Sequence, residues 1–378
     1  MRVADLTVIG GGIVGLGIAR SAVRRGMTVV VLERAALAAE TSANSHGIIH
    51  SGIRYVQHGA MARVVASARA LAELRSHYPE CVAPLPCWMP LRGAGLRGGM
   101  ALKGGHFLYR TALRAQGIAV PQWRGVVASA QLPNHPLLRG RCAGGAFGWE
   151  DGWLCDHQGL VVRVRQEIEL GGGIVHEHTP VGRVVRNAKG FVVEATSGEI
   201  TRCASVVDAR GPSIRHSLLE GESAAVGRAT GEWCLGFNVS LSIDISQGCG
   251  VAVSTSGGRL LFVAPRRGIG GAHSAIGTGY LGVEGERVPV VTEEHVASLV
   301  HAVAEATGVR VSLSDVVGVE SGILPRSTTV HHEVVADAST RLFSHQGFLV
   351  VQSGKYTTFP VVGEQVIAAV QRWMNWRK

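Results

Sequence analysis

The chain has 378 residues, of which 46% are hydrophobic and 17% charged, and it contains 51 glycines. These values predict a folded protein of two domains and exclude a disordered chain or a collagen-like repeat. The formal net charge of +9 fits an anionic substrate, an anionic membrane surface or the general composition of an Arg-rich proteome. No long run of Lys and Arg occurs, so nucleic acid is not expected as a partner.

The seven cysteines show neither a C-x-x-C pair nor zinc spacing. We therefore expect reduced thiols in a cytoplasmic protein and no metal site, with a Cys81–Cys87 pair as the minor alternative. No apolar stretch reaches the roughly 18 residues that a membrane-spanning helix needs. Peripheral contact with the inner face of a membrane stays open.

The first forty residues show the order strand, glycine turn, helix, strand and acid. Strands are predicted over residues 5–9 and 28–32, and a helix over 16–25. In the turn between them, Gly10 permits the tight bend, Gly12 lets a pyrophosphate approach the backbone, and Gly15 lets the helix pack on the strand. The helix start, with Ile13 and Val14, would hold phosphates.

Side chains that follow the second strand also indicate a dinucleotide site. Glu33 is placed to accept hydrogen bonds from a ribose diol, while the adjacent Arg34 keeps a 2′-phosphate open as a weaker alternative. The next loop is small and polar, and its members Thr41, Ser42, Ser45 and His46 are expected to contact the diphosphate or, alternatively, to be solvated.

His50 and Arg54 are four residues apart, but Gly52 between them argues against a shared helical face. Arg54 is a candidate anion clamp because a guanidinium matches carboxylate and phosphate geometry; the alternative is a structural salt bridge. His50 is a candidate proton acceptor or, equally, a core histidine.

Further elements follow in chain order. We expect a helix over 61–78, a proline-rich departure at 79–90, and a Gly- and Arg-rich region of poor periodicity over 91–147. An acidic, Gly-containing loop is expected at 148–156. The remaining predicted helices cover 160–170, 293–305 and 361–376. The predicted strands cover 173–176, 182–186, 190–195, 200–203, 206–208, 234–239, 250–254, 260–264, 275–279 and 315–322, and a further strand opens the segment 347–360.

The glycine turn, Glu33, Thr41-Ser42 and the stretch 50–55 together resemble the FAD-dependent glycerol-3-phosphate dehydrogenases and the wider D-amino-acid-oxidase-like family. This resemblance implies an α/β fold. A discontinuous Rossmann-type FAD domain would comprise 1–85, 150–225 and 327–378, and a mixed-sheet α+β substrate domain would comprise 86–149 and 226–326. The resemblance does not include the helical C-terminal domain of many of these dehydrogenases.

The resemblance also implies roles for residues late in the chain. A backbone group near Val181 would contact adenine, and Ala209 and Gly211 would close over the cofactor. The segment Gly354, Lys355, Tyr356, Thr357 and Thr358 is similar to the family's Gly-Gly-Lys-Leu-Thr-Thr, where the chain meets the flavin and Lys lies near the substrate. In the family's Gly-x-Arg-Pro-Leu, Arg binds the substrate; here Leu324 holds that position, and Arg326 is the expected replacement unless the head group differs.

The resulting hypothesis is an FAD-dependent dehydrogenase or oxidase that transfers hydride from a small anionic alcohol to flavin N5. Glycerol 3-phosphate and 2-hydroxy acids are the expected substrate types. His50 would act as the base, and Arg54, Arg326 and Lys355 would hold the anion. An amino acid or amine oxidase and a catalytically silent flavin-binding protein remain as alternatives, and oxygen, a quinone or a protein remain as electron acceptors.

Overall fold

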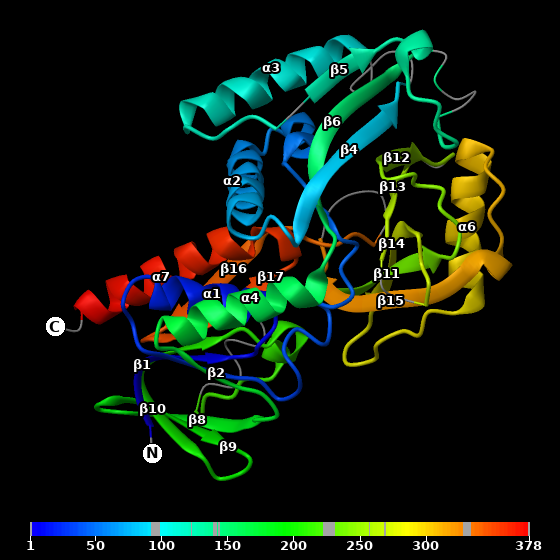
Figure 1. The fold of residues 1–378 in the computed structure, drawn as a ribbon. Helices are drawn as coiled ribbons and strands as arrows, with labels where there is room; N and C mark the ends of the chain where they lie inside the picture. The colour runs from blue at the N-terminus through cyan, green and yellow to red at the C-terminus, as the bar shows by residue number, and fades with distance from the viewer. Residues whose placement is uncertain are drawn as a thin grey trace.

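The computed structural model describes residues 2–91, 99–121, 123–138, 142, 144–221, 231–256, 258–267, 270–327 and 334–376. Residues 225 and 226, where the sequence places a domain limit, lie outside these ranges. Two large sheets dominate the described part of the chain, with helices packed against each of them (Figure 1). Among the described residues, no helix is long and apolar enough to cross a bilayer.

The first sheet has the strand order β16-β17-β10-β1-β2-β7, and a β8–β9 hairpin extends from β10. β1 pairs in parallel with β2 and β10, and β10 pairs in parallel with β17. The carboxyl ends of these four strands therefore lie at one edge of the sheet, where parallel α/β sheets bind their ligands. The strands are β1 (Arg2–Ile9), β2 (Val29–Leu32), β7 (Ile174–His176), β8 (Val181–Asn187), β9 (Gly190–Ala195), β10 (Ile200–Asp208), β16 (Thr340–His345) and β17 (Phe348–Ser353).

Alternating side chains of the first sheet enter two separate cores, as the period of two in a strand requires. Val29 and Val31 of β2 belong to a cluster with the helices α1 (Ile13–Val23), α2 (Met61–His77), α4 (His157–Leu170) and α7 (Phe359–Trp376). Val30 and Leu32 point the other way and pack with residues of the β8–β9 hairpin. Both faces are thus covered, and the parallel strands can be apolar throughout.

The first and the last helix of the chain cross at glycines. A Cβ atom on Gly363 of α7 would lie 2.3 Å from the carbonyl oxygen of Gly17 in α1, and one on Gly17 would lie 2.7 Å from that of Phe359. These distances are far below van der Waals contact, so the two helices approach this closely only because both positions lack a side chain.

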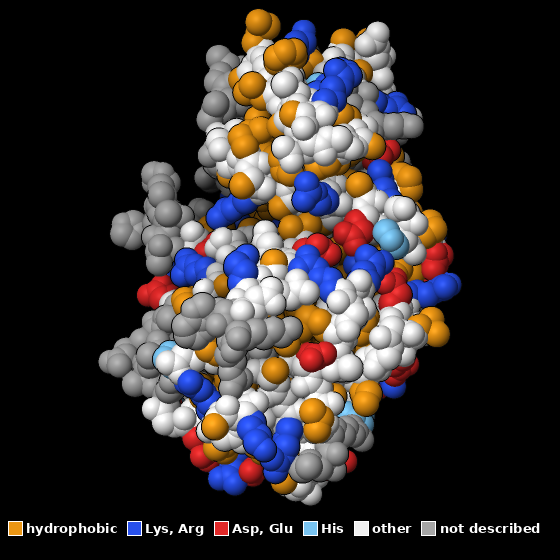
Figure 2. All heavy atoms as spheres, turned by 90° about the vertical axis from the view of Figure 1, so that its left-hand side faces the viewer, with side chains coloured by type: hydrophobic (Ala, Val, Ile, Leu, Met, Phe, Trp, Pro, Cys, Tyr) orange, Lys and Arg blue, Asp and Glu red, His pale blue; other side chains and the backbone are white. Residues whose placement is uncertain are grey.

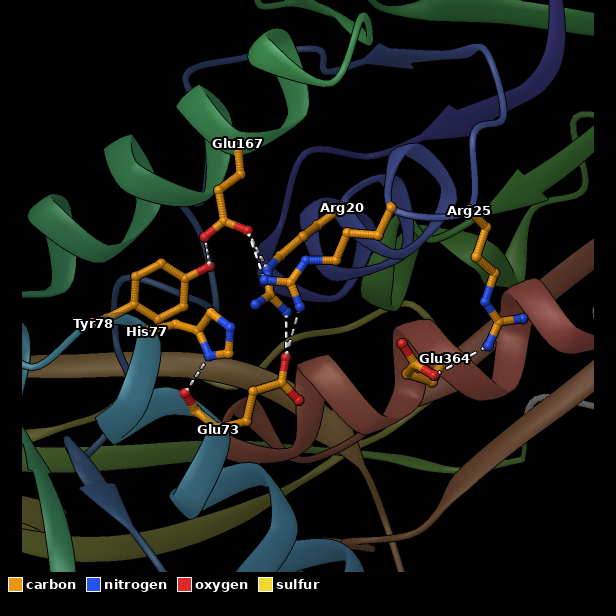
Figure 3. Close-up of polar contacts among 8 residues, drawn as sticks. Arg20, Arg25, Glu73, His77, Tyr78, Glu167 and Glu364 are labelled. Carbon is orange, nitrogen blue, oxygen red and sulfur yellow. Dashed lines mark hydrogen bonds and ion pairs between the residues drawn. The ribbon is translucent and has the colours of Figure 1, made fainter.

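A polar cluster joins α1, α2 and α4 (Figure 3). The guanidinium of Arg20 is 1% exposed and lies 2.6 Å from a carboxylate oxygen of Glu73 and 2.8 Å from one of Glu167. The hydroxyl of Tyr78 donates a 2.6 Å hydrogen bond to Glu167. A buried guanidinium between two carboxylates is charge-compensated, so its burial is tolerated.

The second sheet is mixed, with the order β15-β11-β14-β13-β12-β4-β6-β3 and with β5 paired to β6. α6 (Glu293–Thr307) packs its buried side chains against β11, β12 and β14, and α3 (Gly99–Ala115) lies near β5 at the far end (Figure 1). The strands are β3 (Ile48–Ile49), β4 (Val82–Pro90), β5 (Trp123–Val127), β6 (Ala146–Leu154), β11 (Trp233–Leu241), β12 (Gly250–Ser254), β13 (Leu260–Pro265), β14 (Ser274–Val283) and β15 (Val316–Pro325).

Most expected elements are present, and three differ. Residues 91–147 include the helix α3, which the glycines of this region conceal because they weaken a helical pattern. Residues 148–156 lie mainly in the strand β6 and not in a loop. β10 runs unbroken through residues 200–208, where two separate strands were expected. β6 also continues through residue 150, at which the sequence places another domain limit. The division into domains stays a prediction.

Candidate functional site

A cavity of about 480 Å³ lies between the two sheets. One wall is formed by the carboxyl ends of β1, β2, β10 and β17, and the opposite wall by β11, β14 and β15 of the second sheet. Segments from both ends of the chain therefore face one another across it. Most of the predicted site residues line this cavity: Gly10, Gly12, Ile13, Val14, Glu33, Arg34, Thr41, Ser42, Ser45, His46, His50, Val181, Ala209, Gly211, Gly354, Lys355, Tyr356 and Thr357.

The glycine turn forms one end of the cavity, as a phosphate-binding turn does. Gly10 has a φ of +105°, and its Cβ would lie 2.7 Å from the carbonyl oxygen of Ala209. A Cβ on Gly15 would lie 1.9 Å from the carbonyl oxygen of Gly10, so Gly15 serves the packing of α1 and does not line the cavity. The backbone at Gly12 is open, because a Cβ there would meet only the Ser42 hydroxyl, at 3.4 Å.

Glu33 follows β2 directly and lies beside this turn. One carboxylate oxygen accepts a 2.6 Å hydrogen bond from the backbone N–H of Gly11, and the other accepts one of 2.8 Å from Ala35. The carboxylate is thereby fixed at the cavity wall. Arg34 forms an ion pair with Glu40, and both side chains are about half exposed.

The polar loop 41–46 crosses from the first sheet to the second. Ser42 accepts a 3.1 Å hydrogen bond from the backbone N–H of Ile13 at the start of α1. Thr41 accepts one of 3.2 Å from the backbone N–H of Ile323 in β15, so part of its hydrogen-bonding capacity is used within the protein. Burial, and then the positive charge of Arg266, lower the pKa of His46 to about 3, so His46 is neutral.

The far end of the cavity is built by residues just before α7. β17 ends at Ser353, and a single 3-10 turn, η5 (Tyr356–Thr358), leads directly into α7, two residues earlier than the predicted helix start. The hydroxyls of Tyr356 and Thr357 are buried and have no hydrogen-bond partner among the described residues. Thr358 is buried but does not line the cavity; its hydroxyl lies 3.4 Å from the carbonyl oxygen of Lys355.

His50 is held by a carboxylate that the sequence prediction did not include. Its Nδ1 lies 2.8 Å from Oδ2 of Asp151, which is 1% exposed on β6. The other oxygen of Asp151 accepts hydrogen bonds of 2.7 Å from the N–H and the hydroxyl of Ser51. Burial opposes ionisation of Asp151, but these hydrogen bonds outweigh it and lower its pKa.

Arg54 lies on the other side of the His50 ring, with Nη1 3.2 Å from Nε2. A carboxylate only accepts and a guanidinium only donates, so His50 carries its proton on Nδ1 and presents a lone pair on Nε2. Burial lowers the pKa of His50 in spite of Asp151. Arg54 is exposed, does not line the cavity itself and stacks on the rings of Tyr55 and Phe262.

Lys355 faces this group from the opposite end of the chain. Its ammonium donates a 2.7 Å hydrogen bond to Ser67 and lies 4.7 Å from the centre of the Tyr55 ring. Burial lowers the pKa of Lys355 to about 7, and the positive charges of Arg54 and Arg63 act in the same direction. Lys355 is therefore not a solvated turn residue.

Arg326 lies elsewhere, which corrects the expectation that it supplies the missing charge. β15 ends at Pro325, and Arg326 forms an ion pair of 3.3 Å with Glu232 outside the cavity lining. Leu324 does line the cavity, so the position at which the related dehydrogenases carry arginine is apolar here.

Several residues that line or support the cavity were missed by the sequence prediction, among them Asp151, Asn238, Thr278 and Tyr280. Asp151 stands in a Trp-Glu-Asp-Gly-Trp segment, and an acid between two tryptophans was the available signal. The other three lie on β11 and β14 with no distinctive spacing. Asn238 accepts a 3.0 Å hydrogen bond from the Thr278 hydroxyl and donates one of 3.2 Å to the carbonyl oxygen of Asn44.

The donor set fits FAD. The start of α1 and the open backbone at Gly12 suit a diphosphate, and Glu33 suits a ribose diol. The buried hydroxyls of Tyr356 and Thr357 lie at the opposite end, where the isoalloxazine would extend. A cavity that is shared by a parallel sheet and a mixed sheet, with a glycine turn at one end, defines a dinucleotide-dependent redox protein.

Comparison with known proteins specifies this class. Residues 5–369 match the model of the DAO family, described as FAD dependent oxidoreductase, and the chain belongs to this family. FAD is accordingly its cofactor, and the chain is an FAD-dependent oxidoreductase.

Relatives with stated activities include glycerol-3-phosphate dehydrogenase 1 of Mycobacterium tuberculosis, which is 30% identical over 96% of this chain and 72% of its own length. D-erythritol 1-phosphate dehydrogenase of Brucella abortus is 26% identical, again over 96% of this chain and 72% of its own length. The structure of an L-alpha-glycerophosphate oxidase from Mycoplasma pneumoniae superimposes with a TM-score of 0.71 at 14% identity. It covers 98% of this chain and 95% of the oxidase chain. The last similarity concerns the fold alone.

Proposed function

We propose that the protein oxidises the hydroxyl group of a small polyol phosphate, of the glycerol 3-phosphate type. The observation that carries this proposal is the cluster of His50, Arg54 and Lys355, in which His50 and Lys355 line the cavity and Arg54 contacts the His50 ring beside it. It combines a neutral imidazole with two cationic groups, which suits an alcohol that carries an anion. The named activities of the mycobacterial and Brucella relatives support the same substrate class.

In this proposal, Arg54 and the protonated Lys355 bind the phosphate, because charge-assisted hydrogen bonds are the strong ones. When Arg54 turns from His50 to the phosphate, the lone pair on His50 Nε2 is free to take the hydroxyl proton as the carbonyl forms. Asp151 stabilises the resulting imidazolium through Nδ1. Held by the residues described above, FAD would supply the acceptor for the hydride that leaves the same carbon. The contact of Arg54 with the His50 ring places the proposed anion clamp beside the proposed base.

Anaerobic mixing of the yellow holoenzyme with separate substrates tests the proposal. We expect glycerol 3-phosphate or D-erythritol 1-phosphate to bleach the oxidised-flavin absorbance, and L-2-hydroxyglutarate and amino acids to leave it unchanged. Bleaching by amino acids alone would replace the proposal with amine oxidation. Bleaching by L-2-hydroxyglutarate alone would change the proposed substrate class to 2-hydroxy acids.

Arg54→Ala should raise the KM for the phosphate substrate by about 10- to 100-fold, since a hydrogen bond to a charged group contributes about 1.5–3 kcal/mol. The flavin should stay bound. Arg326→Ala is the matched control: Arg326 pairs with Glu232 outside the cavity, and the KM of this variant should be that of the wild type. Unchanged kinetics in Arg54→Ala would remove Arg54 from the site.

A further inference from the structure

The helix α3 exposes apolar side chains on its outer face. Met100, Phe107 and Leu108 are 83%, 69% and 56% exposed. The opposite face is firmly packed, since Tyr109 and Leu113 are buried in a cluster with residues of α2 and the turn η1 (Ile53–His58). The exposed residues thus belong to a well-anchored helix. Large apolar side chains gathered in water usually mark an interaction surface.

The same helix is strongly cationic. It carries Lys103, Arg110 and Arg114 and contains no acidic residue. The imbalance extends beyond the helix: between Cys81 and Trp149 the sequence has eight Lys and Arg residues and no Asp or Glu. This segment therefore carries almost all of the molecule's net charge of +9.

On a helical projection the two kinds of side chain are neighbours. Met100 and Phe107 lie one above the other, and Lys103, Arg110 and Arg114 follow along one flank, because residues three, four and seven apart share a face. Figure 2 shows orange and blue side chains gathered together on the upper end of the molecule, where α3 lies in Figure 1.

We propose that this face of α3, defined by Met100, Lys103, Phe107, Leu108, Arg110 and Arg114, binds the surface of an anionic lipid bilayer. Exposed apolar side chains flanked by cations are the composition of helices that lie in the membrane interface. The apolar members enter the boundary of the acyl chains, while the cations contact anionic head groups. A nucleic acid would satisfy the cations but would leave Phe107 and Leu108 in water.

The surface is one layer away from the cavity. The Tyr109 hydroxyl donates a 3.1 Å hydrogen bond to the carbonyl oxygen of Ser51, next to His50, and the inner face of α3 packs on the turn that carries Arg54 and Tyr55. A bilayer bound to the outer face of α3 would therefore lie close behind the substrate end of the site.

Vesicle sedimentation of the holoenzyme tests the inference. We expect the protein to bind vesicles of phosphatidylcholine and phosphatidylglycerol at low ionic strength. Binding to pure phosphatidylcholine should be weaker by at least about tenfold, and added salt should weaken it on the anionic vesicles. Phe107→Ser/Leu108→Ser and, separately, Lys103→Gln/Arg110→Gln should each reduce binding by about tenfold or more with flavin content unchanged.

Matched controls use residues of the same type away from α3. Leu170→Ser/Val290→Ser removes two side chains that are 89% and 79% exposed, and Arg186→Gln/Lys189→Gln removes two exposed cations of the β8–β9 hairpin. Both should bind as the wild type does. Absence of binding to anionic vesicles, or equal losses in the control variants, would overturn the inference. Binding of duplex DNA that depends on α3, in the absence of vesicle binding, would assign the surface to nucleic acid instead.

Discussion

The ammonium of Lys355 is buried, with Arg54 and Arg63 near enough to disfavour its charge and Asp151 near enough to favour it. Its hydrogen bond to Ser67 joins residues 288 positions apart in the sequence. With a pKa of about 7, the ammonium is present in only part of the enzyme at neutral pH. Binding of an anion should therefore depend on pH in a range where lysines are ordinarily fully charged.

We expect kcat/KM for the phosphate substrate to fall as pH rises through about 7, because the protonated form of Lys355 binds the anion and the free enzyme loses it there. In Lys355→Arg the guanidinium stays charged, so this falling limb should move to higher pH. The pH profile of kcat/KM, measured on both proteins, is the test, with Arg326→Ala expected to keep the wild-type profile. If the fall of kcat/KM in Lys355→Arg occurs at the same pH as in the wild type, a group other than Lys355 causes it.

The ion-pair cluster of Arg20 acts at the level of elements, since it connects α1 with α2 and α4 (Figure 3). Arg20 is buried, whereas Glu73 and Glu167 are 21% and 31% exposed. Burial opposes ionisation of Glu167, but hydrogen bonds from Tyr78 and Arg20 lower its pKa below the ordinary 4.5. Its contribution to stability is thus present above about pH 4.5 and is lost as pH falls through the lower folded-state pKa.

Removing the two carboxylates should cost more than removing the cation. Glu73→Gln/Glu167→Gln leaves the Arg20 charge buried without compensation, which costs about 3–5 kcal/mol. Arg20→Met leaves two partly solvated carboxylates that keep Arg24 nearby, so its cost should be smaller. The melting temperatures of the variant holoenzymes show which substitution lowers stability more. Arg25→Met is the control, because its partner Glu364 is 55% exposed and such a surface pair contributes at most about 1 kcal/mol.

At the scale of the whole molecule, α1 crosses α7 at Gly17 and Gly363. α1 follows the glycine turn at one end of the cavity, and α7 follows the segment 354–358 at the other end, so this crossing connects the two ends. Gly363→Ala should lower the melting temperature and promote release of FAD, since its Cβ would lie 2.3 Å from a backbone oxygen and the helices must separate. The same substitution at Gly104 in α3 meets no atom within 4 Å and should leave both quantities unchanged or slightly raised. If Gly363→Ala and the wild type have equal melting temperatures and retain FAD equally, the helix crossing tolerates a methyl group.

The sequence predicted what depends on short segments. The glycine turn, Glu33 and the segment at Gly354 are local patterns, and most of these residues line the cavity. Asp151 could not be inferred in this way, because its bonds to His50 and Ser51 cross about a hundred residues and depend on the pairing of β3 with β6. Arg326 was misplaced for a similar reason, since the end of β15 at Pro325 turns it toward Glu232.

The strand order β17-β10-β1-β2 has a consequence for synthesis of the protein. A ribosome releases β1 and the glycine turn long before β17 and α7, which complete the cavity. A nascent chain that ends before residue 348 has neither the neighbour of β10 nor the partner of Gly17. The complete cofactor cavity can therefore form only after translation has passed these segments, so a shorter nascent chain cannot enclose the flavin.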